Sequence, residues 1–511
     1  MKTILKYSFW FGSAIAILSS CDPKVEAPTP TLDGQIDVSN YVAIGNSITA
    51  GYASNGLYLE GQKVAYPVLM AEQFKLAGGG EFVAPLFSQD QAAGTGYLRL
   101  LGFSGATPLI VPVPGSPNAV LRIGDSLATN ASLNPTGLVL KPFEGTKINN
   151  WGVPGIRIAD IETPGYAFPN SYFGRLVPET EKLKPYATKI LEQNPTFFSC
   201  WLGNNDVLGF ATAGGSELLA NVTDNGLFAR NYRNLITKLL DKPTPPKGVL
   251  ANIPDVTSLP FFTTVGPSIR PLIPAAVPGF YEFKFDSVIS KVSSVLLAVA
   301  LNVPPTVTII DTTKGSAWPV GRIATLNPFT KNFDGDIFFT LTFSPYASTL
   351  GRPSGAAWRQ IIRTLMGQFN LPSTAEPAIW AASGLDTLQP FGFSFRNPIP
   401  DVFVLNPNET AKAKSTVAGF NRIIEGLARE KGLAYVNANS FLSNITKGSY
   451  FDAISSNASF ISGGPFSLDG VHLTPKGNAM AANEFIKSIN EKYGTKITVL
   501  NVGQYKGVTF P

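Results

Sequence analysis

The sequence predicts an α/β fold with a doubly wound parallel sheet, and two patterns along its 511 residues support this prediction. Short apolar runs with the length and composition of buried strands recur between residues 41 and 437. Segments with apolar residues three and four positions apart, the spacing of one helix face, separate them. Because such sheets bind ligands beyond the carboxyl ends of their strands, the residues that follow each run are the candidates for a site.

Each expected element is a short stretch that can be read from the sequence. Five runs are expected to be strands: residues 41–44 (YVAI), 147–150 (KINN), 196–202 (TFFSCWL), 248–253 (GVLANI) and 434–437 (AYVN). Three amphipathic segments are expected to be helices between them: residues 66–76, 227–240 and 416–431.

Two long stretches break this alternation. Residues 78–145 are rich in Gly, Pro and Ser, and residues 261–405 are rich in Phe, Pro and Trp, with helices expected at 280–301 and 356–369. Both are too long to be simple loops, so we interpret them as insertions that cover the site. The Phe-rich insertion is either a hydrophobic lid that binds an acyl chain or a unit with a core of its own.

The composition excludes several classes of function. With 44% hydrophobic and 15% charged residues the chain is globular rather than disordered. The net charge is only +5 and no basic run occurs, so no nucleic-acid partner is expected. One His and two Cys are too few for the usual zinc or haem ligand sets or for a disulfide framework. Any metal would therefore have to bind oxygen ligands; we predict no metal site and no cofactor.

The N-terminus has the pattern of a secretion signal. Lys2 and Lys6 precede an apolar stretch at residues 9–18, which is too short to span a bilayer. Leu18-Ser19-Ser20-Cys21 resembles a bacterial lipobox, which implies a signal peptide at 1–20 and lipidation of Cys21. A Pro-rich tether at 21–37 would follow. The expected location is the bacterial cell envelope, with a lipid anchor in the membrane; the alternative is an ordinary signal peptide with a chance cysteine.

Four motifs follow expected strands or stand near the C-terminus. They are Gly45-Asn46-Ser47-Ile48-Thr49-Ala50-Gly51, Asn150-Trp151-Gly152-Val153-Pro154-Gly155, Gly203-Asn204-Asn205-Asp206 and Asp469-Gly470-Val471-His472-Leu473-Thr474-Pro475. Each alone has an ordinary structural explanation as a turn or a helix cap. Together, and in this order, they resemble the conserved blocks of the SGNH (GDSL-like) hydrolases. Within that family, the chain looks like the large lipoprotein members of Bacteroidetes.

The resemblance implies a flavodoxin-like three-layer α/β/α sandwich and a serine esterase or lipase. It covers about residues 37–260 and 406–492. We accordingly divide the chain into a hydrolase core at 38–260 and 406–498, the insertions at 78–145 and 261–405, and a tail at 499–511. The expected substrate is an ester, either a lipid or acyl ester or an acylated glycan, and the Phe-rich insertion slightly favours the acyl ester.

The resemblance assigns each catalytic role to one residue. Ser47 matches the nucleophile, which attacks only if a base takes its proton. His472 matches that base and is the single histidine of the chain. Asp469, three residues earlier, matches the carboxylate that orients the imidazole. The oxyanion hole would consist of the backbone NH groups of Ser47 and Gly155 and the side-chain amide of Asn205.

Three other positions need comment. The literal Gly124-Asp125-Ser126-Leu127 lies inside the first insertion without a helical pattern after it, so we reject Ser126 as the nucleophile. Asn46 stands where the family has aspartate, and its carbonyl oxygen still provides a local hydrogen-bond acceptor. Cys200, in an apolar run, is interpreted as a small buried hydrophobic residue.

Two other functions remain open at this stage. One is a surface lipoprotein that binds ligands on a hydrolase fold without turnover. The other is an acyltransferase, in which an alcohol instead of water accepts the acyl group. The number of subunits is left open.

Overall fold

The computed structural model describes residues 30–32, 36–105, 107–121, 138–215, 220–269, 280–283, 320–324, 337–368, 371–394, 396–451 and 454–510. Its centre is a sheet of five parallel strands in the order β12-β6-β5-β1-β4. The strands are β1 (Tyr41–Gly45), β4 (Asn150–Gly152), β5 (Phe197–Trp201), β6 (Lys247–Ala251) and β12 (Ala434–Val436). If these five strands are numbered from 1 to 5 in chain order, their order across the sheet is 2-1-3-4-5. The direction in which successive strands are added therefore reverses beside β1.

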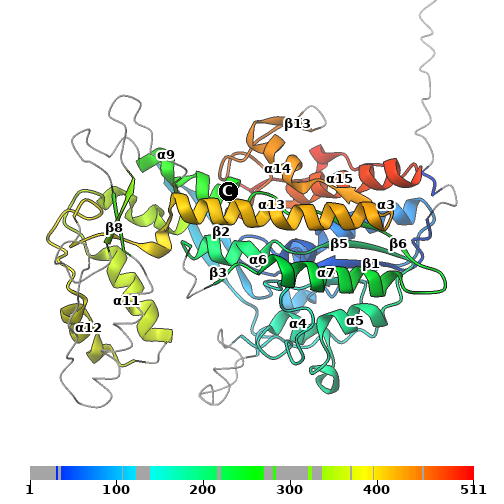
Figure 1. Ribbon diagram of the computed structural model, residues 1–511, viewed down its shortest axis with the longest axis horizontal. Coiled ribbons are helices and arrows are strands. Elements are labelled where there is room, and N and C mark those ends of the chain that lie inside the picture. The colour runs from blue at the N-terminus through cyan, green and yellow to red at the C-terminus, as the bar shows by residue number, and fades with distance from the viewer. Residues whose placement is uncertain are drawn as a thin grey trace, which may run out of the picture.

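Helices cover both faces of this sheet (Figure 1). On one face, Tyr66 of α3 (Tyr66–Leu76) packs between Trp201 of β5 and Phe485 of α15 (Pro475–Tyr493), with ring centroids 5.4 and 4.7 Å away. On the other face, the Tyr232 hydroxyl of α7 (Asn225–Leu240) lies 3.6 Å from the sulfur of Cys200. Since neighbouring residues of a strand point to opposite faces, the two helix layers enclose the sheet.

The strands and helices of this core lie close to their expected positions, with differences that have local causes. α3 has the expected bounds, and α7 begins two residues early, at the cap formed by Asp224. α13 (Pro407–Glu430), which packs beside α7, begins well before residue 416 because Asn406 and Glu409 form a capping box. The prediction of a strand at 147–150 was wrong except at Asn150, because the Asn149 NH donates to the Val83 carbonyl at 2.8 Å, outside the sheet, and the strand continues instead to Gly152.

The stretch 78–145 contributes a long antiparallel hairpin formed by β2 (Gly96–Ser104) and β3 (Thr107–Pro114). The remaining α-helices before β6 in the described chain are short: α1 (Ser47–Ala50), α2 (Leu59–Lys63), α4 (Ser171–Leu176), α5 (Tyr186–Glu192) and α6 (Asn205–Thr212).

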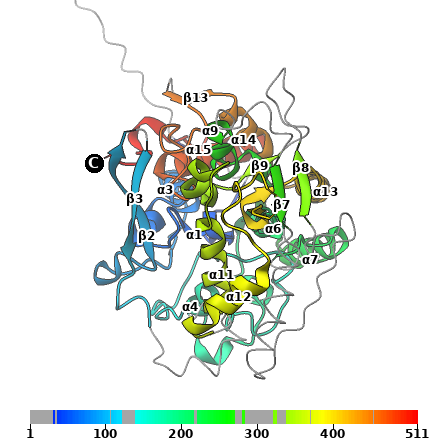
Figure 2. The same ribbon diagram turned by 90° about the vertical axis from the view of Figure 1, so that its left-hand side faces the viewer.

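The stretch 261–405 has a second hydrophobic core. The helices α11 (Ala356–Gln368) and α12 (Glu376–Ser383) belong to this part of the chain, which stands beside the sheet domain in Figure 1 and faces the viewer in Figure 2. Its core includes Trp358 and four phenylalanines that are at most 5% exposed, Phe339, Phe343, Phe391 and Phe403. Within the described residues, these phenylalanines therefore support the second interpretation of the insertion, a unit with its own core.

The prediction of a helix at 280–301 is wrong for its first four residues. Residues Phe280–Phe283 form a strand, β7, which pairs with β8 (Val320–Ala324) and with β10 (Ile399–Pro400). The run FYEF is dominated by aromatic residues, which fit a pleated sheet at least as well as a helix. Residues 284–301 lie outside the described part.

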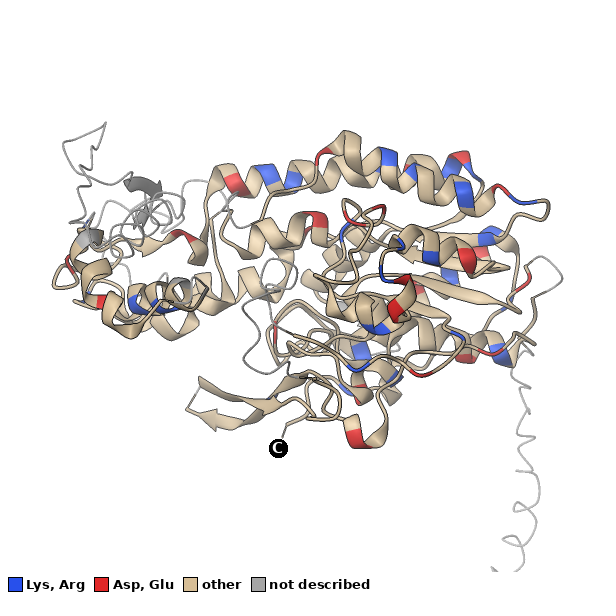
Figure 3. Cartoon of the chain, turned by 90° about the horizontal axis from the view of Figure 1, so that it is seen from below, with Lys and Arg blue, Asp and Glu red and all other residues tan. Residues whose placement is uncertain are grey.

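The other α-helices and strands of the described chain are α8 (Pro260–Thr263), α9 (Val265–Ile269), β9 (Phe338–Phe339), β11 (Val404–Leu405), α14 (Ala438–Thr446), β13 (Ser449–Phe451) and β14 (Ile454–Ser456). In Figure 3, Lys and Arg and Asp and Glu are interspersed over the described part of the chain, although α11 carries arginines and no acidic residue. Among the described helices, none is both long and apolar enough to cross a bilayer.

Candidate active site

Ser47 lies on a tight turn between β1 and α1. The Asn46 side-chain oxygen accepts the NH of Ile48 at 3.1 Å and so caps α1, the local role expected of its carbonyl oxygen. A Cβ on Gly152 of β4 would lie 2.2 Å from the Ala50 nitrogen, so only glycine lets α1 lie directly against that strand. This turn places Ser47, 6% exposed, at the carboxyl end of the sheet where the strand order reverses.

The structure brings His472 to Ser47 across 425 residues of sequence. The His472 Nε2 lies 2.8 Å from the Ser47 Oγ. His472 lies in the loop before α15, which begins as predicted: the Thr474 side chain accepts the NH of Gly477, and Pro475 takes the first helical position. The rigid start of α15 thus fixes the loop that carries the imidazole.

Asp469 completes a chain of three hydrogen-bonded side chains. Its Oδ2 lies 2.9 Å from the His472 Nδ1, and its Oδ1 accepts the backbone NH groups of Val471 at 2.9 Å and His472 at 2.8 Å. Burial alone would raise the pKa of Asp469, but the neighbouring His472 charge and these hydrogen bonds outweigh burial and hold it well below the usual range. The carboxylate therefore stays ionised and accepts the Nδ1–H of the imidazole.

A loop that the sequence analysis did not identify supports this carboxylate. The NH of Asn55 donates to the Asp469 Oδ2 at 2.8 Å, and the Ser467 hydroxyl donates to Oδ1 at 3.1 Å while it accepts the NH of Ser54. Ser54 and Asn55 both have positive φ, 49° and 65°. The Ser-Asn-Gly sequence at 54–56 is a turn signal, but nothing in it indicates which side chain the turn contacts.

Tyr52 fixes the other side of the imidazole. Its ring centroid lies 4.7 Å from that of His472, with the planes tilted by 52°. Burial raises the pKa of Tyr52 well above its usual value, so the phenol remains neutral. The histidine ring is thus held by a carboxylate at one edge and an aromatic ring beside it.

The three proposed oxyanion donors lie on the neighbouring strand ends. Val153 NH donates to the Gly45 carbonyl at 3.0 Å, so the loop carrying Gly155 starts beside the end of β1. In the described part of the chain, the backbone NH groups of Ser47 and Gly155 donate to no protein group. Asn205 donates one amide hydrogen to the Ile156 carbonyl at 3.0 Å, which leaves its second hydrogen for a ligand. Gly155 has a φ of +82°, a conformation that favours glycine.

Side chains from α6, from α7 and from the N-cap of α4 fix the loop that contains Gly155. The Asn170 amide donates to the Pro154 carbonyl at 2.9 Å, and the Asn231 amide donates to the Ile158 carbonyl at 3.0 Å. The buried Asp206 carboxylate accepts the NH groups of Ile158 at 2.8 Å and Ala159 at 3.2 Å. Asp206, which the sequence predicts only as part of a motif or a helix cap, therefore holds the backbone of the loop that contains Gly155.

Asp206 predicts a specific dependence of stability on pH. Burial raises its pKa to about 6, above the unfolded value of about 3.9. Between these values the folded chain binds more protons, so the free energy of unfolding falls as pH rises from 4 to 6. The expected loss is up to about 3 kcal/mol relative to Asp206→Asn, measured by urea unfolding across this range. A difference between the two proteins that is constant with pH would contradict a raised pKa.

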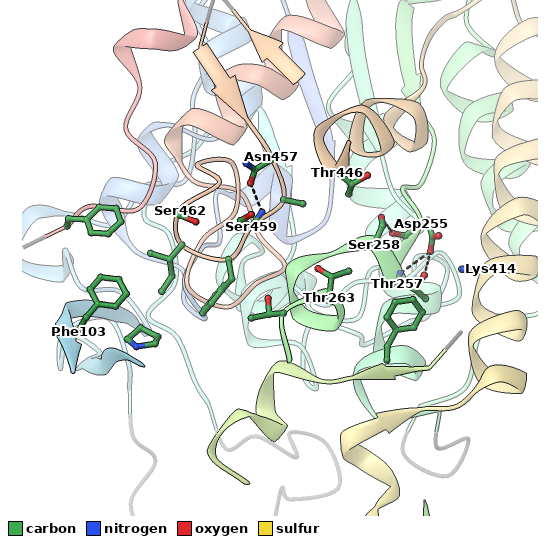
Figure 4. A pocket seen from close by; sticks show the side chains of 17 residues that line it. Phe103, Asp255, Thr257, Ser258, Thr263, Lys414, Thr446, Asn457, Ser459 and Ser462 are labelled. Atoms are coloured by element: carbon green, nitrogen blue, oxygen red, sulfur yellow. Dashed lines mark hydrogen bonds between the residues drawn. The ribbon is translucent and has the colours of Figure 1, made fainter. Parts of the chain in front are cut away.

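A large groove (Figure 4) is bounded by segments that contact the loop of Asp469 and His472, although none of the candidate site residues lines it. The volume of the groove is about 800 Å³. Four phenylalanines and a larger number of hydroxyl and amide side chains line it. The lining residues labelled in Figure 4 include Phe103, Thr257, Ser258, Thr263, Thr446, Asn457, Ser459 and Ser462. One wall is tied to the loop because the NH of Phe261 donates to the Gly470 carbonyl at 3.0 Å. On the opposite wall, Ile461 packs with Leu468, the neighbour of Asp469.

Of the remaining predicted residues, the structure describes only Cys200. Ser126 and Cys21 lie outside the described residues. Cys200 is fully buried, and burial raises the pKa of its thiol to about 12, which suits a hydrophobic residue better than a nucleophile. Among the described residues, no cluster of His, Cys, Asp and Glu could hold a metal ion.

Comparison of the chain with protein-family models, with curated proteins and with solved structures finds no match in any of the three.

Proposed function

We propose that this protein is a serine hydrolase that cleaves carboxylic esters through an acyl-enzyme, with Ser47, His472 and Asp469 as its catalytic residues. The observation that carries this proposal is the unbroken chain from the Ser47 Oγ through the imidazole to Asp469, with contacts of 2.8 and 2.9 Å. In this proposal the chain is an SGNH-type hydrolase with a flavodoxin-like three-layer core, and the strand order 2-1-3-4-5 supports it.

The geometry fits two proton transfers by one imidazole. Because Nδ1–H donates to Asp469, the Nε2 lone pair faces the Ser47 hydroxyl and takes its proton as Oγ attacks the ester carbonyl. The alcohol leaves with that proton, and an acyl ester forms on Ser47. Water then attacks the acyl carbon and gives a proton to Nε2, and Nε2 returns this proton to the Ser47 Oγ as the bond between Oγ and the acyl carbon breaks and the acid leaves.

Three donors are available for the negative oxygen of each tetrahedral intermediate. The NH groups of Ser47 and Gly155 donate to no other protein group in the described chain, and Asn205 has one amide hydrogen to spare. Donors held in place before the reaction stabilise the charge without reorganising, which is the largest single contribution in many acyl-transfer enzymes.

Replacement of Asn205 tests the oxyanion hole. Asn205→Ala is expected to lower kcat for nitrophenyl acetate by roughly 10² to 10³-fold with little change in KM, because the donor acts on the charge of the transition state. Asn204→Ala is the matched control, since it removes the adjacent amide and leaves the bond from Asn205 to Ile156 in place. Equal losses in the two variants would argue against Asn205 as a donor.

The direct test of the proposal is covalent labelling. A fluorophosphonate probe is expected to label the wild-type protein at Ser47, and nitrophenyl esters are expected to turn over. A protein that binds ligands on this fold without turnover would do neither. Added acceptor alcohols distinguish hydrolysis from acyl transfer, since a transferase forms the new ester.

Substrate choice is proposed to depend on the groove beside the catalytic loop. Its phenylalanines suit an acyl chain, whereas its hydroxyl and amide groups suit a glycan that carries an acyl group. A panel of nitrophenyl esters of increasing chain length, run beside acetylated oligosaccharides, separates these classes. The preference for an acyl ester was based on the many phenylalanines of residues 261–405. Because several of them are buried in the second core, they cannot contact a substrate, and the preference is weaker.

We also propose that Cys21 carries a lipid anchor in the bacterial cell envelope, on the basis of the lipobox-like residues 18–21 and the Pro-rich stretch after them. Full-length protein expressed in a bacterium is expected to incorporate labelled palmitate and to partition into detergent, and Cys21→Ala is expected to abolish both. Labelling that persists in the variant would place the lipid elsewhere.

A further inference from the structure

The groove in Figure 4 is formed by segments that are distant in the sequence. The hairpin of β2 and β3 contributes Phe103, the loop at 457–462 forms a second part, and residues from 255–264 form a third. Phe103 lies at one end of the groove, and Asp255 and Lys414 lie at the other. Its volume of about 800 Å³ falls in the range of sites that hold a whole small molecule, roughly 300 to 1,000 Å³. The groove therefore has room for a ligand of several rings.

The hydrogen-bonding groups of the groove are mostly neutral. Of the 17 residues that line it, eight carry a hydroxyl or an amide, and only Asp255 and Lys414 carry a charge. These two charges have opposite signs, and the Asp255 carboxylate already accepts the NH and the hydroxyl of Thr257, at 2.9 and 2.7 Å. A charged ligand would find no excess of the opposite charge here. The lining therefore favours a neutral polar ligand over a phosphorylated or carboxylated one.

Most of the hydroxyl groups are fixed as acceptors. Five of them donate within their own turn or helix, which occupies their hydrogens: Thr257, Ser258, Thr263, Thr264 and Thr446. Their oxygens keep lone pairs that can accept from a ligand. Asn457 adds a donor, because its oxygen accepts the Ser459 NH at 2.8 Å and its NH₂ group has no acceptor in the described chain. A ligand rich in hydroxyl groups, which both donate and accept, matches this lining.

Two aromatic rings at one end of the groove are exposed. The ring of Phe103 stacks against that of Phe510, with centroids 6.0 Å apart and planes 20° from parallel. Phe103 is 45% exposed and Phe510 is 54% exposed. The negative face of an aromatic ring attracts the C–H bonds of a sugar ring, whose hydroxyl groups can stay in water. An acyl chain on the same open surface would remain partly in water, which reduces the gain from burying it.

We infer that this groove binds a neutral oligosaccharide. Its sugar rings stack on Phe103 and Phe510, and its hydroxyl groups donate to the threonine and serine oxygens and accept from Asn457. An acyl chain would make none of these hydrogen bonds. Binding of the oligosaccharide does not depend on the proposed esterase activity, because no candidate catalytic residue lines the groove.

The position of the groove also indicates what the proposed enzyme would act on. The NH of Phe261 donates to the Gly470 carbonyl at 3.0 Å, and Ile461 packs with Leu468, so segments on two sides of the groove contact the catalytic loop. This step rests on the proposed function: the substrate is then an acylated glycan, with its chain held in the groove and its ester at Ser47.

Calorimetric titration of the full chain tests the groove. The probes are neutral hexasaccharides of glucan, xylan, mannan and galactan, together with hexagalacturonate and decanoate. At least one neutral hexasaccharide is expected to bind. Phe103→Ala and Phe510→Ala are each expected to weaken that binding by roughly three- to tenfold, because each removes one stacking ring. Leu109→Ala is the matched control: Leu109 lies on the same hairpin and is 46% exposed, but it does not line the groove, so the affinity should not change.

The binding and the reaction can be tested separately. Both phenylalanines are largely exposed, so their alanine variants should keep the Tm of the wild-type protein, and weaker binding then reports on the groove. Ser47→Ala should bind the hexasaccharide as tightly as the wild type, whether or not Ser47 is a nucleophile. With the acetylated form of the bound hexasaccharide as substrate, Phe103→Ala is expected to raise KM and Leu109→Ala to leave KM unchanged.

Three results would each overturn the proposed glycan site. They are the failure of every neutral hexasaccharide to bind, equal affinity in Phe103→Ala, Phe510→Ala and the wild type, and binding of decanoate or hexagalacturonate alone. Failure of the esterase proposal has a different sign, which is the absence of fluorophosphonate labelling at Ser47 in a protein that still binds the hexasaccharide.

Discussion

Ser47→Ala is expected to abolish labelling by a fluorophosphonate probe and to reduce kcat/KM for nitrophenyl acetate by roughly 10⁴-fold or more. The loss is large because Oγ is the atom that bonds to the acyl carbon, and the neighbouring groups, however well placed, offer no other nucleophile at that point. Whatever turnover remains would come from the oxyanion donors and substrate binding, which the variant keeps. Intact mass spectrometry and initial rates measure the two effects.

The variant should fold normally, which makes the result interpretable. Alanine retains the Cβ of Ser47, and the cap of α1 belongs to Asn46, so the turn keeps its hydrogen bonds. Unchanged Tm in the variant checks this. Ser126→Ala is the control for the literal Gly-Asp-Ser-Leu sequence and should retain full labelling. Labelling lost in Ser126→Ala but kept in Ser47→Ala would mean that the wrong serine was chosen.

Much of the core was predictable because its signals are local. The amphipathic spacing of α3 and the Thr474-Pro475 start of α15 are each set by residues within a few positions of one another. The parallel sheet then brings motifs that follow separate strands to one edge. A single histidine in the chain left only one candidate for the base, so its position beside Ser47 could be predicted without knowing the path between them.

What the sequence could not predict depends on contacts between distant residues. The NH of Asn55 binds Asp469 across 414 positions, and Asp206 binds the NH of Ile158 across 48. Neither bond leaves a periodic pattern, and an isolated Asp or Asn has several ordinary local roles. The strand at Phe280–Phe283 was missed for a different reason, since a short aromatic run has no period that separates strand from helix.

Asp469→Asn is expected to lower kcat by about 10⁴-fold, because it puts the imidazole in the wrong tautomer. In the wild-type protein Asp469 Oδ1 accepts the Ser467 hydroxyl and two backbone NH groups, and Oδ2 accepts the Asn55 NH and faces the His472 Nδ1. An asparagine has only one oxygen, and the three donors at the Oδ1 position will keep it there. Its NH₂ group then faces Nδ1, which must accept, so that Nε2 carries the proton and cannot take one from Ser47.

Asp469→Asn is also expected to change the free energy of unfolding, and the lowered pKa of Asp469 determines the sign of this change. A carboxyl whose pKa is lower when folded contributes stability above its unfolded pKa of about 3.9 and loses it as pH falls below that value. The variant should therefore be less stable than wild type at neutral pH, and the difference should shrink in acid. Urea unfolding at neutral and acidic pH measures this difference.

Ser467→Ala distinguishes two causes of a lower kcat: the wrong tautomer of the imidazole, and the loss of any one hydrogen bond to the Asp469 carboxylate. It removes one donor to Oδ1 and the acceptor for the Ser54 NH, but leaves both oxygens of Asp469 and the bond to Nδ1 unchanged. Its kcat should fall less than about tenfold, because the loss of one hydrogen bond costs on the order of 1 kcal/mol. Comparable losses of kcat in Ser467→Ala and Asp469→Asn would show that Asp469 acts by holding the loop rather than by orienting the base.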